Sequence, residues 1–158
     1  MSELQTVSRD ETIAVDALVD EVLVDLEPLA QEKEIKLIGN CKDTTMVGSD
    51  ILIYRMVYNL VENAIKYNHF GGQVTVTAYR KGKNICLSVE DTGSGIPAEL
   101  KERIFEPFFR VDKSRSRQLG GVGLGLALVR EIVRVHDGRI TVQSSPSGGT
   151  IFEVVFTQ

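Results

Sequence analysis

The sequence predicts a two-layer α/β sandwich, in which a mixed, mostly antiparallel sheet packs against about three helices. Apolar residues recur at helical spacing in three separate segments. Two pairs of segments with alternating apolar residues are each joined by a short turn that contains glycine, as in β-hairpins. Helices and strands do not alternate regularly, which argues against a doubly wound parallel sheet.

Length and composition narrow the class of protein. The 158 residues fit one domain, and 42% apolar with 25% charged residues is ordinary for a globular protein. No window approaches the roughly 18 uninterrupted apolar residues of a membrane span, and the start lacks the basic flank and apolar run of a signal peptide. We therefore expect a cytoplasmic chain without membrane contact. A net charge of −4 argues against nucleic-acid binding.

The hydrophobic pattern places the first elements. Residues 1–11 are polar and show no period, so we interpret them as a linker or an expression remnant and residues 12–158 as the domain. A helix is expected from Asp16, a good N-cap, and Pro28 should kink or interrupt it. Two short strands are expected next, over residues 35–39 and 45–47.

The remaining elements follow in the order helix, hairpin, helix, hairpin. Ser49-Asp50 is expected to cap a long helix that reaches about Asn68. A hairpin turns at Gly82-Lys83-Asn84 and ends at Asp91, and a short helix is expected near residues 98–103. The last elements are a helix over residues 122–136 and a hairpin of residues 140–144 and 151–156.

The long second helix carries a polar stripe. At about 100° per residue, Asn59, Asn63 and Lys66 share one face. Asparagine is a poor residue for a helix interior, so two of them on one face favour a ligand. An amide oxygen suits a Mg²⁺ ion that keeps several waters, and an ammonium group suits phosphates. An ordinary solvated helix face is the alternative.

A glycine-rich turn follows the first hairpin, with the sequence Asp91-Thr92-Gly93-Ser94-Gly95-Ile96-Pro97. A carboxylate at this place can accept a hydrogen bond from an exocyclic amine, and glycines let the backbone approach a flat base. This chemistry suits adenine. A plain structural turn is the alternative.

Two further segments could contact phosphates. The segment Gly120-Gly121-Val122-Gly123-Leu124-Gly125-Leu126 opens the last helix, where exposed N–H groups and the helix dipole attract anions. It is not a Walker loop, and a flexible hinge is the alternative. The segment Phe105-Glu106-Pro107-Phe108-Phe109-Arg110 precedes a basic run. It is either core followed by a solvated loop, or the base of a lid that closes over phosphates.

These four segments, in this order and spacing, resemble the nucleotide-binding boxes of sensor histidine kinases, within the gyrase, chaperone and mismatch-repair ATPase superfamily. Residues 59–67 resemble the asparagine box, 91–97 the first glycine box, 105–110 the phenylalanine box and 121–126 the second glycine box. The resemblance covers roughly residues 12–157. It implies a Bergerat-type ATP-binding fold and a protein-histidine kinase with ATP and Mg²⁺ as cofactors.

The resemblance also implies roles for single residues. Asn63 would hold Mg²⁺, with Asn59 assisting nearby. Lys66 and Arg110 would contact phosphate, and Asp91 would bind the adenine amine. Further contacts to the nucleotide would come from Tyr67, Gly93, Gly95, Ile96, Phe105, Phe108, Gly121, Val122, Gly123, Leu124, Gly125 and Leu126.

The acceptor of the phosphate is expected on another domain. His69 and His136 lack the His-Glu/Asp-x-x-x-Pro setting of the histidine that the family phosphorylates, so we expect structural roles for both, with His136 as a cation that complements a helix end. The implied partners are ATP or ADP, the parent kinase's own dimerisation and phosphoacceptor domain and, indirectly, a response regulator of a two-component system. The isolated chain is expected to be a monomer.

Three alternatives stay open. The first is an ATP hydrolase of the superfamily, which carries a glutamate one helical turn before the Mg²⁺ asparagine. This chain has Asn59 at that position, and a carboxamide cannot take a proton from water. Glu62 lies nearby on the same helix and keeps this alternative open. A serine kinase of the anti-sigma type would not be expected to have the full phenylalanine box and the long basic loop. A nucleotide-sensing module without catalysis is the third alternative.

Overall fold

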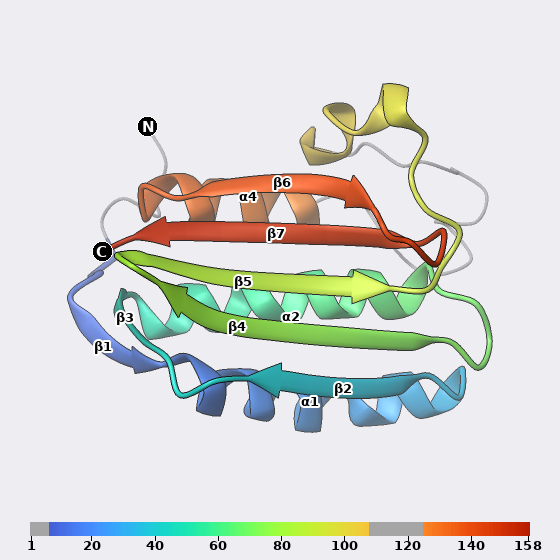
Figure 1. Cartoon of the computed structure of the whole chain (residues 1–158), viewed down its shortest axis with the longest axis horizontal. Coiled ribbons are helices and arrows are strands. Elements are labelled where there is room, and N and C mark those ends of the chain that lie inside the picture. The colour runs from blue at the N-terminus through green and yellow to red at the C-terminus, as the bar shows by residue number, and fades with distance from the viewer. Residues whose placement is uncertain (1–6, 108–124) are drawn as a thin grey trace.

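The computed structural model describes residues 7–107 and 125–158. A five-stranded sheet forms one layer, and helices cover one of its faces (Figure 1). The strands in spatial order are β2 (Lys36–Cys41), β4 (Gln73–Lys81), β5 (Asn84–Asp91), β7 (Thr150–Thr157) and β6 (Arg139–Ser144). The helices are α1 (Val15–Glu32), α2 (Asp50–Lys66) and α4 (Gly125–Val135). Because the β2–β4 pair is parallel and the other pairs are antiparallel, the predicted mixed, mostly antiparallel sandwich is confirmed.

Alternating residues of the central strands form the core beneath the helices. In β4, Val74, Val76 and Ala78 are fully buried, and the residues between them are partly exposed. Burying each valine-sized side chain contributes about 1.5–3 kcal/mol. The same alternation buries Ile85, Leu87 and Val89 in β5 and Phe152, Val154 and Phe156 in β7.

The start of the fold differs from the prediction. A strand β1 (Glu11–Ala14), which the hydrophobic pattern did not indicate, pairs antiparallel with β3 (Thr45–Gly48) in a second, two-stranded sheet. Because β1 runs directly into α1, Ala14 occupies the N-cap and Asp16 falls in the first turn. The prediction of Asp16 as the N-cap is therefore wrong.

Pro28 lies inside α1 without ending the helix. Proline lacks the N–H that would bond to the carbonyl of Val24 one turn earlier. Val24 is 71% exposed, so water can bond to that carbonyl instead. Of the two expected effects, an interruption at Pro28 does not occur, and the expected single helix is observed.

The start of α2 agrees with the prediction, and its end comes slightly earlier. Ser49 is the N-cap, and its Oγ accepts a hydrogen bond from the Leu52 N–H at 3.3 Å. Asn68 lies beyond the helix because its side chain bonds to backbone groups outside it. Its Oδ1 accepts from the His69 N–H at 2.8 Å, and its Nδ2 donates to Gln73 O at 3.0 Å.

The connections complete the fold. Gly82 and Lys83 join β4 to β5 in the predicted hairpin. Two short 3-10 turns, η2 (Ala98–Leu100) and η3 (Arg103–Phe105), replace the predicted helix near residues 98–103. The predicted start of the last helix, at residues 122–124, lies outside the described residues. Within residues 7–107 and 125–158, no helix combines the length and the apolar character that crossing a membrane requires.

Candidate functional site

Predicted site residues meet at the end of the sheet where β5 finishes. The C-terminal end of α2, the loop after β5 and the β6–β7 turn lie together there, on the right in Figure 1. Asp91 ends β5, and its side chain is hydrogen-bonded to the first residue of β7, Thr150. The structure thus brings residues from three separate parts of the chain to one end of the fold.

Asp91 is the buried acidic group of this site. Its side chain is 7% exposed, and Oδ1 accepts hydrogen bonds from the N–H groups of Gly93 at 2.9 Å and Thr150 at 3.2 Å. No hydrogen bond from a described residue falls on Oδ2. Burial raises the pKa of the Asp91 carboxyl, while the two N–H donors act in the opposite direction. One oxygen is therefore fixed by the protein, and the other can accept a hydrogen bond from a ligand.

The β6–β7 turn packs tightly against Asp91. A Cβ at position 149 would lie 2.0 Å from Asp91 O and 2.8 Å from Oδ1, so only glycine fits there. The turn is closed by a hydrogen bond from the Ser145 N–H to Gly149 O at 3.0 Å, and the Ser145 hydroxyl donates to the Glu90 carboxylate. Gly95, with a φ of +78°, approaches a carbonyl of the same turn. Sequence reasoning assigned residue 149 to a hairpin turn only and missed its place beside Asp91.

A polar network joins the end of α2 to the loop after β5. The Thr92 hydroxyl donates to Asn68 Oδ1 at 3.1 Å and accepts from the Gln73 N–H at 2.9 Å. Asn68 is fully buried. Sequence reasoning did not assign this network, although an Asn directly after a polar helix stripe was a signal for it.

The polar stripe of α2 lies on a half-buried face, as its spacing predicted. Asn59 Nδ2 donates to the backbone oxygen of Gly125, the first residue of α4, at 3.5 Å. Lys66 Nζ lies 3.9 Å from Glu62 Oε1. The Asn63 side chain makes no hydrogen bond to a described residue, and Tyr67 is the C-cap of the helix. Asn59 thus faces the start of α4, and Asn63 and Lys66 continue the stripe toward the end of α2.

The described part of the phenylalanine segment is anchored in the core. The Phe105 ring packs edge-on against Phe152 at 6.2 Å between centroids, and the Arg130 guanidinium lies 5.9 Å above it. Ile96 and Leu126 also pack, half-buried, against the core. The remaining predicted residues lie outside the described residues: Phe108, Arg110, Gly121, Val122, Gly123 and Leu124.

His136 is held as a neutral imidazole at the far end of α4. Its Nδ1 lies 2.8 Å from Ile132 O, and its Nε2 lies 3.0 Å from the Ser49 backbone nitrogen. Nε2 must accept that N–H, so only Nδ1 carries a proton. Burial lowers the pKa of His136, with the Ile132 carbonyl acting in the opposite direction. The expected cation at this helix end is therefore wrong, because the ring caps the start of α2 instead.

This arrangement fits a purine nucleotide. The available acceptor on Asp91 suits an exocyclic amine such as that of adenine. Amide and ammonium groups on α2 suit phosphates and a hard cation. Within the described ranges, no group of three His, Cys, Asp or Glu side chains could hold a metal ion. The amide oxygen of Asn63 could serve as a single ligand of a hard cation.

Comparison with known families agrees with the geometry. A family described as "Histidine kinase-, DNA gyrase B-, and HSP90-like ATPase" matches residues 48–158. The chain belongs to this family. The chain is thus a histidine kinase-type ATPase domain, and the predicted family resemblance is confirmed.

The relatives of this ATPase domain are named sensor kinases. The chain is 40% identical over 141 residues to the sensor-like histidine kinase SenX3 of Mycobacterium bovis, which covers 89% of this chain and 34% of that protein. It is 42% identical over 138 residues to the adaptive-response sensory kinase SasA of Crocosphaera subtropica. This match covers 85% of this chain and 36% of SasA. The chain therefore spans about a third of the length of these curated relatives.

A solved structure shows the same fold. The nucleotide-free catalytic domain of histidine kinase ThkA superposes with a TM-score of 0.84 at 27% identity, covering 95% of this chain and 96% of that domain. The sandwich described above is thus the fold of a histidine kinase catalytic domain.

Proposed function

We propose that this ATPase domain binds Mg²⁺-ATP and transfers the γ-phosphate to a histidine on the dimerisation and phosphoacceptor domain of its parent sensor kinase. The observation that carries this proposal is the buried Asp91, whose Oδ1 is occupied by two backbone N–H groups while Oδ2 accepts no hydrogen bond from the described residues. Oδ2 would accept a hydrogen bond from the adenine amine, because a carboxylate oxygen is a strong acceptor and no described residue occupies this one. The close approach of Gly149 would keep the carboxylate in this orientation.

The stripe on α2 would bind the other end of the nucleotide. Asn63 would hold Mg²⁺ through its amide oxygen, with Asn59 beside it, and the ion would neutralise phosphate charge. Lys66, now 3.9 Å from Glu62, would contact phosphate. We propose phosphate contacts for Arg110 and for residues 121–124 on the strength of the family resemblance.

Phosphate transfer is favoured over hydrolysis by the residue types on α2. The position from which a hydrolase would activate water holds Asn59, which bonds to Gly125 O and cannot take a proton. Glu62 faces Lys66. A ThkA structure with a TM-score of 0.79 and 26% identity, covering 94% of this chain and 41% of that chain, is a complex with the response regulator protein TrrA. We propose that the parent of this chain likewise passes its phosphate to a response regulator.

The boundaries of the functional unit are part of the proposal. Residues 12–158 would be the catalytic domain, with residues 1–11 as a linker whose last residue, Glu11, begins β1. The domain would act in the cytoplasm and would be a monomer when isolated.

The experiment uses radiolabelled ATP in three mixtures. The domain is incubated alone, with a separately supplied dimerisation domain of a sensor kinase, and with that domain after its histidine is replaced by glutamine. We expect label only on the intact partner, slowly, because positioning supplies much of the catalysis. The Asn63→Ala variant should lose the Mg²⁺ dependence of ATP binding in calorimetry. Acid-labile label on the domain alone, or label on the glutamine variant, would contradict the mechanism.

A further inference from the structure

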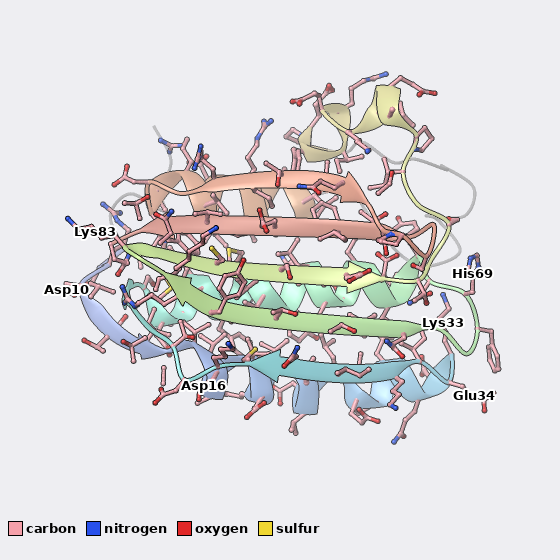
Figure 2. All side chains as sticks on the ribbon, viewed as in Figure 1. Asp10, Asp16, Lys33, Glu34, His69 and Lys83 are labelled. Atoms are coloured by element: carbon pink, nitrogen blue, oxygen red, sulfur yellow. The ribbon has the colours of Figure 1, made fainter. Side chains whose placement is uncertain are left out.

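Lys33 connects the end of α1 to the end of α2. It is the C-cap of α1, and its ammonium group donates to the carbonyl oxygens of Ile65 at 3.2 Å, Lys66 at 2.9 Å and Asn68 at 2.8 Å. Figure 2 shows Lys33 and His69 at the same end of the molecule. A single side chain from outside the four nucleotide segments therefore binds the last turn of the helix that carries the asparagine stripe.

The chemistry of this contact is strong for a half-buried lysine. The last carbonyls of a helix have no partner within the helix, and a cation there also complements the helix dipole. An ammonium group has three N–H donors, and three carbonyls receive them here. Hydrogen bonds to a charged group contribute more than neutral ones.

The same end of α2 touches the loop that holds Asp91. A Cβ on Gly93 would lie 2.6 Å from Tyr67 O and 3.2 Å from the Asn68 Cα, so the glycine loop packs directly on Tyr67 and on Asn68, whose carbonyl Lys33 binds. The Gly93 N–H is in turn one of the two donors to Asp91 Oδ1. A shift of residues 66–68 would therefore move a donor to Asp91.

Lys33 is itself fixed by the chain around it. The Gly71 N–H donates to Lys33 O at 2.8 Å, and the Lys36 N–H donates to Gly72 O at 3.0 Å. These bonds join the α1–β2 connection to the α2–β4 connection. The ammonium group is therefore held against α2 by backbone on both sides.

We propose that Lys33 is a positioning residue for the nucleotide site: by binding the last carbonyls of α2 it keeps the asparagine stripe and the Asp91 loop at a fixed separation. It would act through residues 65–68 and would not touch the nucleotide. This proposal rests on the proposed function of the site. It adds a requirement that lies at the C-cap of α1, outside residues 48–158 that match the family.

The test compares Lys33→Met with Lys33→Arg and with Lys36→Met as the matched control. Methionine keeps the length of the side chain but removes its charge and its N–H donors. Arginine keeps both the charge and the N–H donors. Lys36 is an exposed neighbour, so its variant loses the same charge at the same end of the fold. ADP affinity is measured by calorimetry at a temperature where each variant is fully folded.

We expect Lys33→Met to weaken ADP binding about tenfold, or 1.4 kcal/mol. Lys33→Arg should stay within about threefold and Lys36→Met within about twofold of the wild type. Amide exchange should become faster in residues 65–72 and 91–95 of Lys33→Met and stay unchanged in residues 151–157, which a general loss of stability would not produce. If Lys33→Met does not fold, Lys33→Gln is measured instead, and its ADP affinity and amide exchange should change in the same directions.

Two results would overturn the proposal. One is a folded Lys33→Met or Lys33→Gln variant that binds ADP like the wild type. The other is faster amide exchange spread evenly over the domain. A wild-type chain that does not bind ADP would refute the proposed function instead, and exchange at residues 91–95 would then still report whether Lys33 holds that loop.

Discussion

Replacing Asp91 by asparagine separates recognition of the base from folding. The two N–H groups of Gly93 and Thr150 bond to Oδ1, and an asparagine can keep its oxygen at that place. Its Nδ2 would then stand where Oδ2 stands now. An N–H donor would face the adenine amine, which is also a donor, and the hydrogen bond to the base would be lost.

The magnitude follows from the charge of the lost acceptor. A hydrogen bond to a charged group contributes about 1.5–3 kcal/mol, so ADP affinity should fall by about 10- to 100-fold. The free energy of unfolding at neutral pH should stay the same or rise slightly. Burial raises the pKa of Asp91, which means that the fold disfavours the ionised form, and the amide removes that charge.

Calorimetry with two nucleotides provides the assay. Hypoxanthine has a carbonyl in place of the adenine amine, so IDP can accept from the new amide, and the ratio of ADP to IDP affinity should fall in the variant. Glu153→Gln is the control, because it makes the same change on β7 between the buried residues Phe152 and Val154, on the opposite face. A folded Asp91→Asn variant that binds ADP normally, or that loses ADP and IDP equally, would refute the reasoning.

Two further changes test the packing around the site. Gly149→Ala should cost about 1–3 kcal/mol in unfolding free energy and lower ADP affinity, because the new Cβ would lie 2.0 Å from Asp91 O; an alanine variant with the stability of the wild type in urea unfolding would contradict this packing. His136 should make stability depend on pH. Its folded pKa lies below the unfolded value near 6.5, so the unfolded chain binds more protons between the two values, and the unfolding free energy should fall as the pH drops below about 6.5. His136→Gln should flatten that dependence between pH 7.5 and 5.5, and an unchanged slope would show that another group causes it.

The features that the sequence predicted well are those set by near neighbours. The Ser49 cap depends on a residue three positions away, and the Gly82-Lys83 hairpin on the two strands beside it. Asp91 was recognised because the alternating pattern of its strand stops at a glycine-rich turn. For these residues, local conformation and chemistry carry enough information.

The features that could not be predicted from the sequence depend on contacts between distant parts of the chain. Thr150 donates to Asp91 across 59 positions, and Lys33 reaches carbonyls 32 to 35 positions away. In its local sequence, Gly149 looks like any glycine of a turn, and Lys33 looks like any surface lysine. The Asp16 cap failed for a similar reason, since β1 forms only by pairing with β3.

The contacts of His136 and Asn59 make α2 and α4 behave as one unit. His136 bonds to Ser49 at one end of the pair, and Asn59 bonds to Gly125 at the other. At 1.5 Å per residue, the two contacts lie about 15 Å apart along α2 and about 16 Å apart along α4, so the spacings match. An axial slip of one helix by a turn, about 5.4 Å, would break both contacts at once. Protonation of the imidazole in acid would therefore break the contact with Ser49, while the Asn59 contact and the buried residues Val129, Ile132 and Val133 would still hold α4 in register with α2.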